Sequence, residues 1–190
     1  MSEGRFNKEQ REELLRIARD AVTAAAQGKR LQPPDSSDPL LREKAGAFVT
    51  LTDRDGALRG CIGYISADKP LDDTVSQAAT AAALRDPRFS PLSPEELDGL
   101  GVSISVLSPP KPVKEIEEIE PGVHGLIVRK GYHQGLLLPQ VATRYGWDAA
   151  RFLDETCVKA GLRRGEWRDP DALVQSFTAE VFGDGEPEDS

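Results

Sequence analysis

The sequence predicts an α+β fold in which mainly antiparallel sheets are flanked by helices. Strand-like runs come in pairs separated by tight turns, which is typical of hairpins, and helical segments stand between these pairs. No regular strand–helix–strand alternation of the kind that builds a parallel sheet is present. The chain has 190 residues, of which 38% are hydrophobic and 29% charged. A chain of this length can bury a stable core without disulfides or metals.

The first predicted element is a helix over residues 7–27. Asn7 is a good N-cap, and Gln10 stands at the third helical position, where it completes a capping box. Gly28 is the residue type expected just past a helix end, since glycine adopts the left-handed conformation without strain. The polar segment 32–39, broken by prolines, is predicted to be a loop.

A hairpin and a second helix are predicted next. The β-rich runs 46–52 and 58–65 are separated by a segment that contains Asp55-Gly56, a pair that favours a tight hairpin turn. An alanine-rich helix over 71–84 follows, with acidic residues in its first turn, where the helix dipole favours them. Its small side chains allow close approach to a sheet.

The remaining elements alternate between helix and strand signals. They are a short helix that starts at the Ser93 capping box, a strand over 102–107, a surface segment over 109–121, a second hairpin with strands 125–130 and 135–141, a helix over 147–160 ended by Gly161, and a last strand over 173–182.

Charge and hydropathy exclude several classes of partner. The net charge is −8, and the last eight residues carry four acids and no base. No basic stripe with interleaved aromatics is present, so the sequence argues against a nucleic-acid binder or a binder of anionic membranes. The apolar runs are far shorter than the ~20 residues of a membrane-spanning helix, and we expect no secretory signal, because the N-terminal residues are charged. We expect a cytoplasmic protein with a disordered acidic tail over 183–190.

Few familiar catalytic chemistries fit the residues available. The two cysteines, Cys61 and Cys157, are too few for a disulfide framework, an iron–sulfur cluster or a cysteine-rich zinc site. Motifs for zinc proteases, nucleotide-binding loops and serine hydrolases are absent. No residue spacing predicts a metal site, and no cofactor is predicted.

The strand 58–65 carries the main functional hypothesis. Its alternation places Arg59 and Cys61 on the same face, and a fixed guanidinium beside a thiol favours the nucleophilic thiolate. Gly60 and Gly63 weaken a strand, so each needs a reason: a bulge, or the close approach of a ligand or another backbone. The alternative is that Cys61 is a small buried filler, as Cys157 is expected to be on the inner face of its helix.

Three further residues, Arg88, His124 and Gln140, are candidates for binding. Arg88 lies in an Asp-Pro-Arg-Phe turn, where it could bind an anion or simply pair with Asp86. His124, which precedes a predicted strand, is a better candidate base than His133 at a hairpin tip, and a structural role is the alternative for both. Gln140 follows Pro139, which implies a strand edge or bulge, and could reach into a cleft.

Five sequence blocks resemble the AMMECR-type domain family, whose bacterial and archaeal members are called AmmeMemoRadiSam system protein A. The likeness covers about residues 8–182. The blocks are LRGCIG at 58–63, DPRF at 86–89, HGLIV at 124–128, GLLLPQV at 135–141 and GWDAARFLDETCVKAGL at 146–162. The resemblance implies a single domain of two unequal, interleaved lobes, with LRGCIG at or near a cleft between them. It also implies association with a Memo-type protein and a radical S-adenosylmethionine enzyme, and assigns no activity.

Two classes of function follow. The first is a small-molecule-binding or catalytic protein that uses an arginine-activated Cys61 in the cleft, with Gly60, Gly63, Arg88, His124 and Gln140 as candidate substrate-binding residues. The alternative is a non-catalytic adaptor or scaffold, or a subunit that presents substrate to a radical enzyme.

Overall fold

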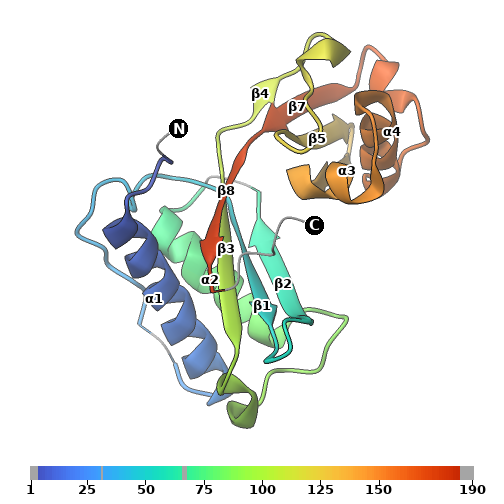
Figure 1. The fold of residues 1–190 in the computed structure, drawn as a ribbon. Coiled ribbons are helices and arrows are strands. Elements are labelled where there is room, and N and C mark those ends of the chain that lie inside the picture. The colour runs from blue at the N-terminus through green and yellow to red at the C-terminus, as the bar shows by residue number, and fades with distance from the viewer. Residues whose placement is uncertain (1–3, 31, 66–67, 185–190) are drawn as a thin grey trace. The chain divides into compact units, whose positions relative to one another are not determined.

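A computed structural model describes residues 4–30, 32–65 and 68–184, which form two compact units (Figure 1). The first unit is formed by two separate parts of the chain, the described residues up to Leu107 and those from Glu180 onward. The second unit spans residues 108–179. Most of the acidic tail predicted over 183–190 lies outside the described residues, which end at Asp184. Within the described part of the chain, no helix combines the length and the apolar character that crossing a bilayer requires.

The first unit is built on a four-stranded sheet with the order β2-β1-β3-β8. The strands are β1 (Ala47–Thr52), β2 (Leu58–Tyr64), β3 (Gly101–Leu107) and β8 (Ala179–Gly183). Strand β1 pairs antiparallel with both β2 and β3. The hairpin predicted over 46–65 is confirmed, and it leaves β2 at an edge of the sheet.

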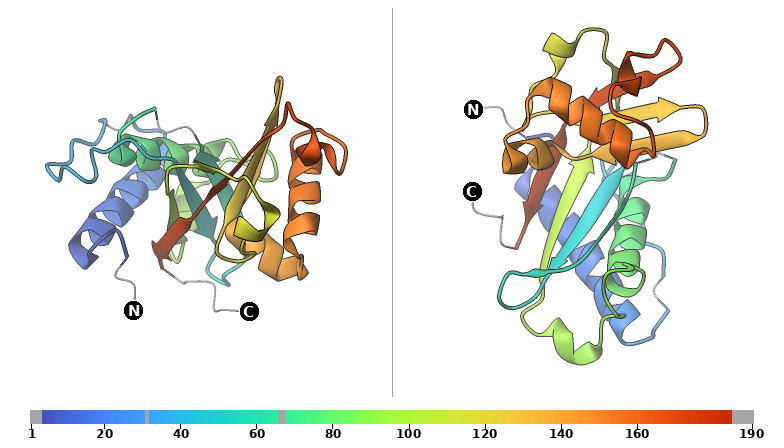
Figure 2. Two further views of the ribbon diagram at one scale, coloured as in Figure 1. Left: turned by 90° about the horizontal axis from the view of Figure 1, so that it is seen from above. Right: turned by 90° about the vertical axis from the view of Figure 1, so that its right-hand side faces the viewer.

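Helices α1 (Lys8–Ala26) and α2 (Leu71–Leu84) cover one face of this sheet (Figure 2). The predicted capping box of α1 is confirmed, since the side chains of Asn7 and Gln10 each accept a hydrogen bond from the other's backbone N–H at 2.9 Å. Gly28 has φ of 63°, the left-handed conformation expected there. Val49 and Leu51 of β1 are fully buried in the core that the helices and the sheet share. The intervening Thr50 points to the opposite face.

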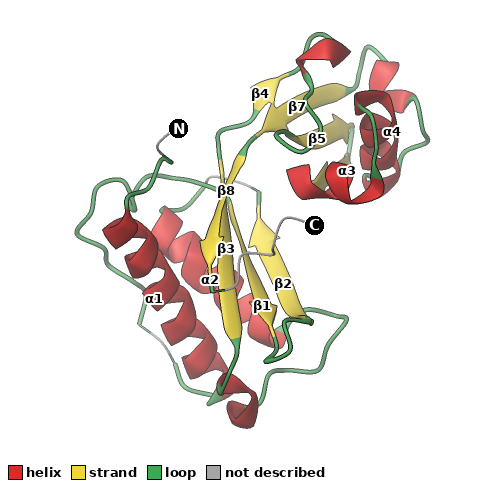
Figure 3. Cartoon of the chain, in the orientation of Figure 1, coloured by secondary structure: helices red, strands yellow, loops and turns green. Residues whose placement is uncertain are grey.

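The second unit has its own sheet and its own core (Figure 3). The sheet order is β4-β7-β5-β6, with strands β4 (Lys111–Pro112), β5 (Gly125–Lys130), β6 (His133–Leu137) and β7 (Leu173–Phe177). Helices α3 (Pro139–Tyr145) and α4 (Ala149–Lys159) complete it, and Phe152, Leu153 and Cys157 of α4 are buried in its core.

Two predicted strands are wrong in extent. The strand predicted over 135–141 ends at Leu137, and Pro139 begins the unpredicted helix α3, because a proline at the first helical position loses no hydrogen bond there. The strand predicted over 173–182 is interrupted at Thr178, and its halves β7 and β8 belong to different sheets. The short helix predicted at Ser93 is a 3-10 helix, η1 (Pro94–Leu97), with the expected capping box.

Candidate functional site

Cys61 lies in the edge strand β2, directly opposite Thr50 of β1. Its backbone N–H donates to the Asp86 Oδ2 atom at 2.8 Å and therefore points away from β1. Thr50 and Cys61 consequently form a non-hydrogen-bonded pair, the type in which side chains approach most closely. The Thr50 hydroxyl donates to the Cys61 Sγ atom at 3.2 Å, and Cys61 is half-buried. Cys61 is thus held on both sides of its strand, by Asp86 at its backbone and by Thr50 at its sulfur.

Asp86 joins the cysteine to an arginine. Its carboxylate, 3% exposed, accepts hydrogen bonds from Arg88 Nε at 2.9 Å and Nη2 at 2.7 Å, as well as from the Arg88 backbone N–H. The Arg88 guanidinium, supported by the N–H groups of Cys61 and Arg88, holds the pKa of Asp86 well below its usual range despite burial. The pairing of Arg88 with Asp86, one of the two alternatives for this turn, is therefore present.

Arg59 has partners other than the thiol. Its guanidinium, 13% exposed, donates to the Glu96 carboxylate at 2.6 and 3.0 Å and to the Ser90 carbonyl at 3.1 Å. These contacts raise the pKa of Arg59, chiefly through Glu96. Arg59 thus fastens the loop that follows α2 against strand β2, and its charge is balanced by Glu96.

The Arg59–Glu96 pair makes stability depend on pH. The hydrogen bond from Arg59, followed by that from the Ser93 backbone, lowers the pKa of Glu96 to about 2 from its ordinary value of 4.5. Because the lowered pKa belongs to the folded state, the stabilisation is complete above pH 4.5 and is lost as the pH falls toward 2.

We expect Glu96→Gln to lower the free energy of unfolding at pH 7 and to match the wild type near pH 2. Urea denaturation of both proteins at several pH values measures this. Glu117→Gln, at an exposed position, is the control for a general loss of charge. A wild-type advantage over Glu96→Gln that is the same at pH 7 and pH 2 would contradict the assignment.

Packing accounts for the two glycines of β2. A Cβ atom on Gly60 would overlap the backbone carbonyl oxygen of Ala82 in α2, and one on Gly63 would overlap the Phe48 ring. Of the reasons expected from the sequence, the close approach of another backbone therefore applies at Gly60. A bulge is also present, since the register of β1 and β2 shifts between Leu51 and Thr52, opposite the start of β2. Gly60 faces the helix, so the adjacent Cys61 lies on the other face of the sheet.

The remaining candidates belong to the second unit. His124 Nδ1 accepts a hydrogen bond from the Glu120 backbone N–H at 3.0 Å, which stabilises its own turn. His133 is not at the hairpin tip: it pairs with Lys130 as the first residue of β6. Gln140 is exposed on α3 and does not stand in a strand. Cys157 is fully buried, and burial raises the pKa of its thiol, as expected for a packing residue.

Thr50 and Glu96 are among the partners of the site that the sequence analysis does not predict. Thr50 could have been found from the register that a tight Asp-Gly turn imposes on the hairpin. Glu96 is the third helical residue of the Ser93 capping box, and no local signal indicates its second role beside Arg59. Among the residues that the structure describes, no group of three or more histidine, cysteine or acidic side chains is arranged to hold a metal ion.

Comparisons with known proteins identify the family. The family model AMMECR1 matches residues 15–182. A protein of Methanothermobacter thermautotrophicus is 49% identical over 89% of this chain and 91% of its own, and one of Thermococcus gammatolerans is 46% identical over 96% and 94%. The crystal structure of the uncharacterised protein PH0010 from Pyrococcus horikoshii superimposes with a TM-score of 0.85 at 44% identity, over 96% of this chain and 95% of that one. The chain belongs to the AMMECR1 family.

Proposed function

We propose that this protein is a small-molecule-binding or catalytic protein whose reactive group is the Cys61 thiol. The observation that carries the proposal is the contact between the Thr50 hydroxyl and the Cys61 sulfur. This hydrogen bond holds the sulfur in a defined position, and cysteine sulfur is the strongest nucleophile among protein side chains. The thiol is half-buried and lies on the sheet face opposite α1 and α2.

The proposal includes a biological setting that rests on the family resemblance. We propose that residues 8–182 act as one AMMECR-type domain in the cytoplasm, together with a Memo-type protein and a radical S-adenosylmethionine enzyme. His124 and Gln140 remain proposed substrate contacts, and the cleft implied by the resemblance stays a prediction. Arg59 is assigned a positioning role, because Glu96 and Ser90 take up its guanidinium.

Alkylation of the folded protein tests the proposal. We expect iodoacetamide at pH 7 to modify Cys61 about tenfold faster than free cysteine, as a reactive catalytic cysteine is modified and a structural one is not. Cys157 is expected to stay unmodified until the protein unfolds, because it is fully buried. Mass spectrometry of peptides that contain each cysteine gives both rates. Cys157→Ala is the matched control, in which the Cys61 rate is unchanged.

The second candidate is an adaptor without chemistry, and a specific observation favours it. Gly60 and Gly63 are explained by packing against Ala82 and Phe48, so no ligand is needed to account for them. If Cys61 reacts no faster than free cysteine, and folded Cys61→Ser still co-purifies with its partners, the catalytic proposal is wrong and the adaptor is the better description. Loss of cellular function in folded Cys61→Ser would instead support chemistry at the thiol.

A further inference from the structure

We infer that Arg88 is the anion-recognising residue of the Cys61 site, and that the ligands of this site carry a carboxylate or phosphate group. The inference rests on the proposed function and adds the class of ligand to it. Four features of the structure support it. Arg88 has hydrogen-bond donors that are free, its guanidinium is fixed by neighbouring residues, and it lies beside Cys61. Arg59, in contrast, is less exposed, and its Nη2 atom already donates to two residues.

One edge of the Arg88 guanidinium donates hydrogen bonds to Asp86, and another edge has donors that are free. The Nε and Nη2 atoms donate to Asp86, whereas Nη1 has no hydrogen-bond partner among the described residues. The side chain is 54% exposed. A guanidinium has five N–H donors in a planar fork, and its Nη1–Nη2 end matches the two oxygens of a carboxylate or phosphate. Arg88 can therefore bind an oxyanion without releasing Asp86.

The guanidinium is held in place before any ligand arrives. Asp86 is 3% exposed and is itself fixed by the backbone N–H groups of Cys61 and Arg88. The Phe89 ring lies below the guanidinium, with Arg88 Cζ 5.4 Å from the ring centroid. An arginine fixed by a bidentate carboxylate and an aromatic face loses little conformational entropy on binding, which favours recognition of small ions.

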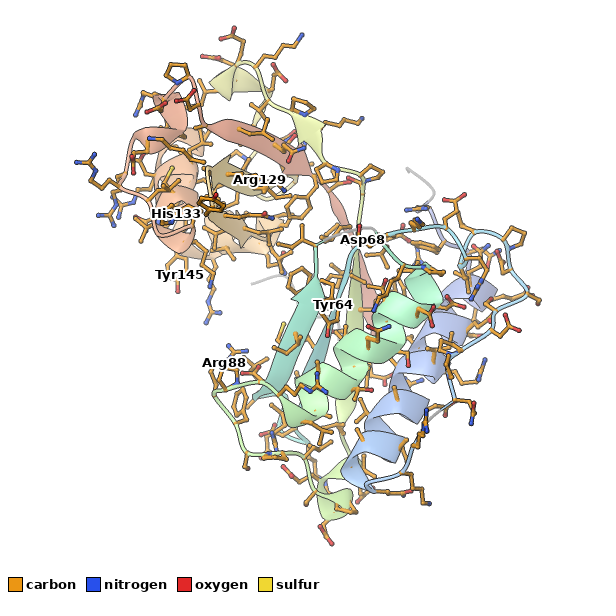
Figure 4. The ribbon with its side chains drawn as sticks, turned by 180° about the vertical axis from the view of Figure 1, so that it is seen from behind. Tyr64, Asp68, Arg88, Arg129, His133 and Tyr145 are labelled. Atoms are coloured by element: carbon orange, nitrogen blue, oxygen red, sulfur yellow. The ribbon has the colours of Figure 1, made fainter. Side chains whose placement is uncertain are left out.

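Arg88 is also next to the thiol-bearing residue. The Asp86 Oδ2 atom accepts hydrogen bonds from both Arg88 Nη2 and the Cys61 backbone N–H, so a single oxygen separates the guanidinium from the cysteine backbone. The hydrogen bond to Asp86 is the main cause of the raised pKa of Arg88 and outweighs the opposite effect of burial. The labelled Arg88 side chain extends from the loop that follows α2, beside strand β2 (Figure 4).

Arg59 does not offer the same pair of donors, because its Nη2 atom already donates to both Glu96 and Ser90. Its Nε and Nη2 atoms are bound by Glu96 and Ser90, and the side chain is 13% exposed, against 54% for Arg88. Of the two arginines that flank the Phe89 ring, only Arg88 therefore presents a largely solvent-exposed guanidinium.

Two alkylating reagents that differ in charge test the inference. In each reaction the Cys61 thiolate attacks the reagent's CH2 carbon, the carbon–iodine bond breaks, iodide leaves, and the thiol proton passes to solvent. Iodoacetate carries a carboxylate and iodoacetamide is its neutral analogue. The ratio of their rates at Cys61 therefore reports anion recognition separately from the reactivity of the thiol.

We expect Arg88→Gln to lower the iodoacetate-to-iodoacetamide ratio about tenfold, the factor that corresponds to one charge-assisted contact. Arg88→Lys, which keeps the charge without the planar fork, should retain part of the ratio. Arg85→Gln removes an equal charge from an exposed position on the same loop and should leave the ratio unchanged. In the wild type, inorganic phosphate at constant ionic strength should slow iodoacetate more than iodoacetamide, a measurement that needs no variant.

Equal ratios in the wild type and in folded Arg88→Gln would overturn the inference, as would equal protection by phosphate against both reagents. Failure of the proposed function looks different, because it appears as an iodoacetamide rate no faster than that of free cysteine. The same experiment therefore tests both. The ratio of the two reagents' rates tests the role of Arg88, and the iodoacetamide rate alone tests the reactivity of Cys61.

Discussion

Asp72→Ala is expected to lower the free energy of unfolding by about 3 kcal/mol, since a buried carboxylate with several partners is lost. Asp72 is 0% exposed at the start of α2. It accepts hydrogen bonds from the Ser36 backbone N–H at 3.1 Å and from the Asp73 backbone N–H at 2.8 Å, and it pairs with Arg42 at 3.2 Å. Without the carboxylate, the buried N–H of Ser36 loses its partner, and a small cavity remains.

Urea denaturation of the wild type and three variants measures the effect. Asp72→Asn keeps an acceptor oxygen and should restore part of the loss. Asp73→Asn is the matched control, because Asp73 is the neighbouring acid in the same first turn and is only partly buried. Its loss should be below about 1 kcal/mol, the usual contribution of a charge near a helix end. Equal losses at the two positions would show that the buried network around Asp72 does not stabilise the fold.

Gly60→Ala is expected to destabilise the protein by about 3 kcal/mol or to prevent folding, as inserting atoms into close-packed structure does. The added methyl group would overlap the carbonyl oxygen of Ala82, and this oxygen is part of a helix backbone that cannot move by itself. Either β2 or α2 would have to shift, and the core that they share contains fully buried residues such as Val75 and Ala79.

Gly63→Ala provides the graded comparison. Its methyl group would meet the Phe48 ring, a side chain that can rotate, as well as the Ala47 carbonyl oxygen. We therefore expect a smaller loss than at Gly60, of about 1–2 kcal/mol. Thermal denaturation followed by circular dichroism ranks the two variants. A stable, fully folded Gly60→Ala protein would contradict the close approach of β2 and α2.

Local signals in the sequence are enough to predict most elements of the fold. Capping residues and turn glycines act within a few residues, so the capping box of α1, the stop at Gly28 and the hairpin over 46–65 are correctly predicted. The errors in the predicted elements occur where a residue is compatible with two kinds of secondary structure. Pro139 is compatible with a strand edge or with the first position of a helix, and the packing of α3 against the second core selects the helix.

The candidate site is less predictable because its contacts join distant parts of the chain. Alternation along β2 correctly places Cys61 on the face opposite Gly60. The partners of Arg59 and of the Cys61 backbone depend on how the loop after α2 folds back along the edge strand, and no periodicity encodes this path. Glu96 is 37 residues from Arg59, and Asp86 is 25 residues from Cys61.

The order of the strands has a consequence for synthesis on the ribosome. Of the strands that the structure describes, β8 is translated last. Its neighbour in the sheet is β3, and the whole of the second unit lies between them in the chain. The sheet of the nascent first unit is therefore incomplete until β8 leaves the ribosome, and one edge of β3 has unpaired backbone groups during that time. Arg11 and Arg19 of α1 also receive their carboxylate partners, Glu180 and Asp184, only then. A chain that terminates early would keep this unpaired edge, which is a surface prone to aggregation.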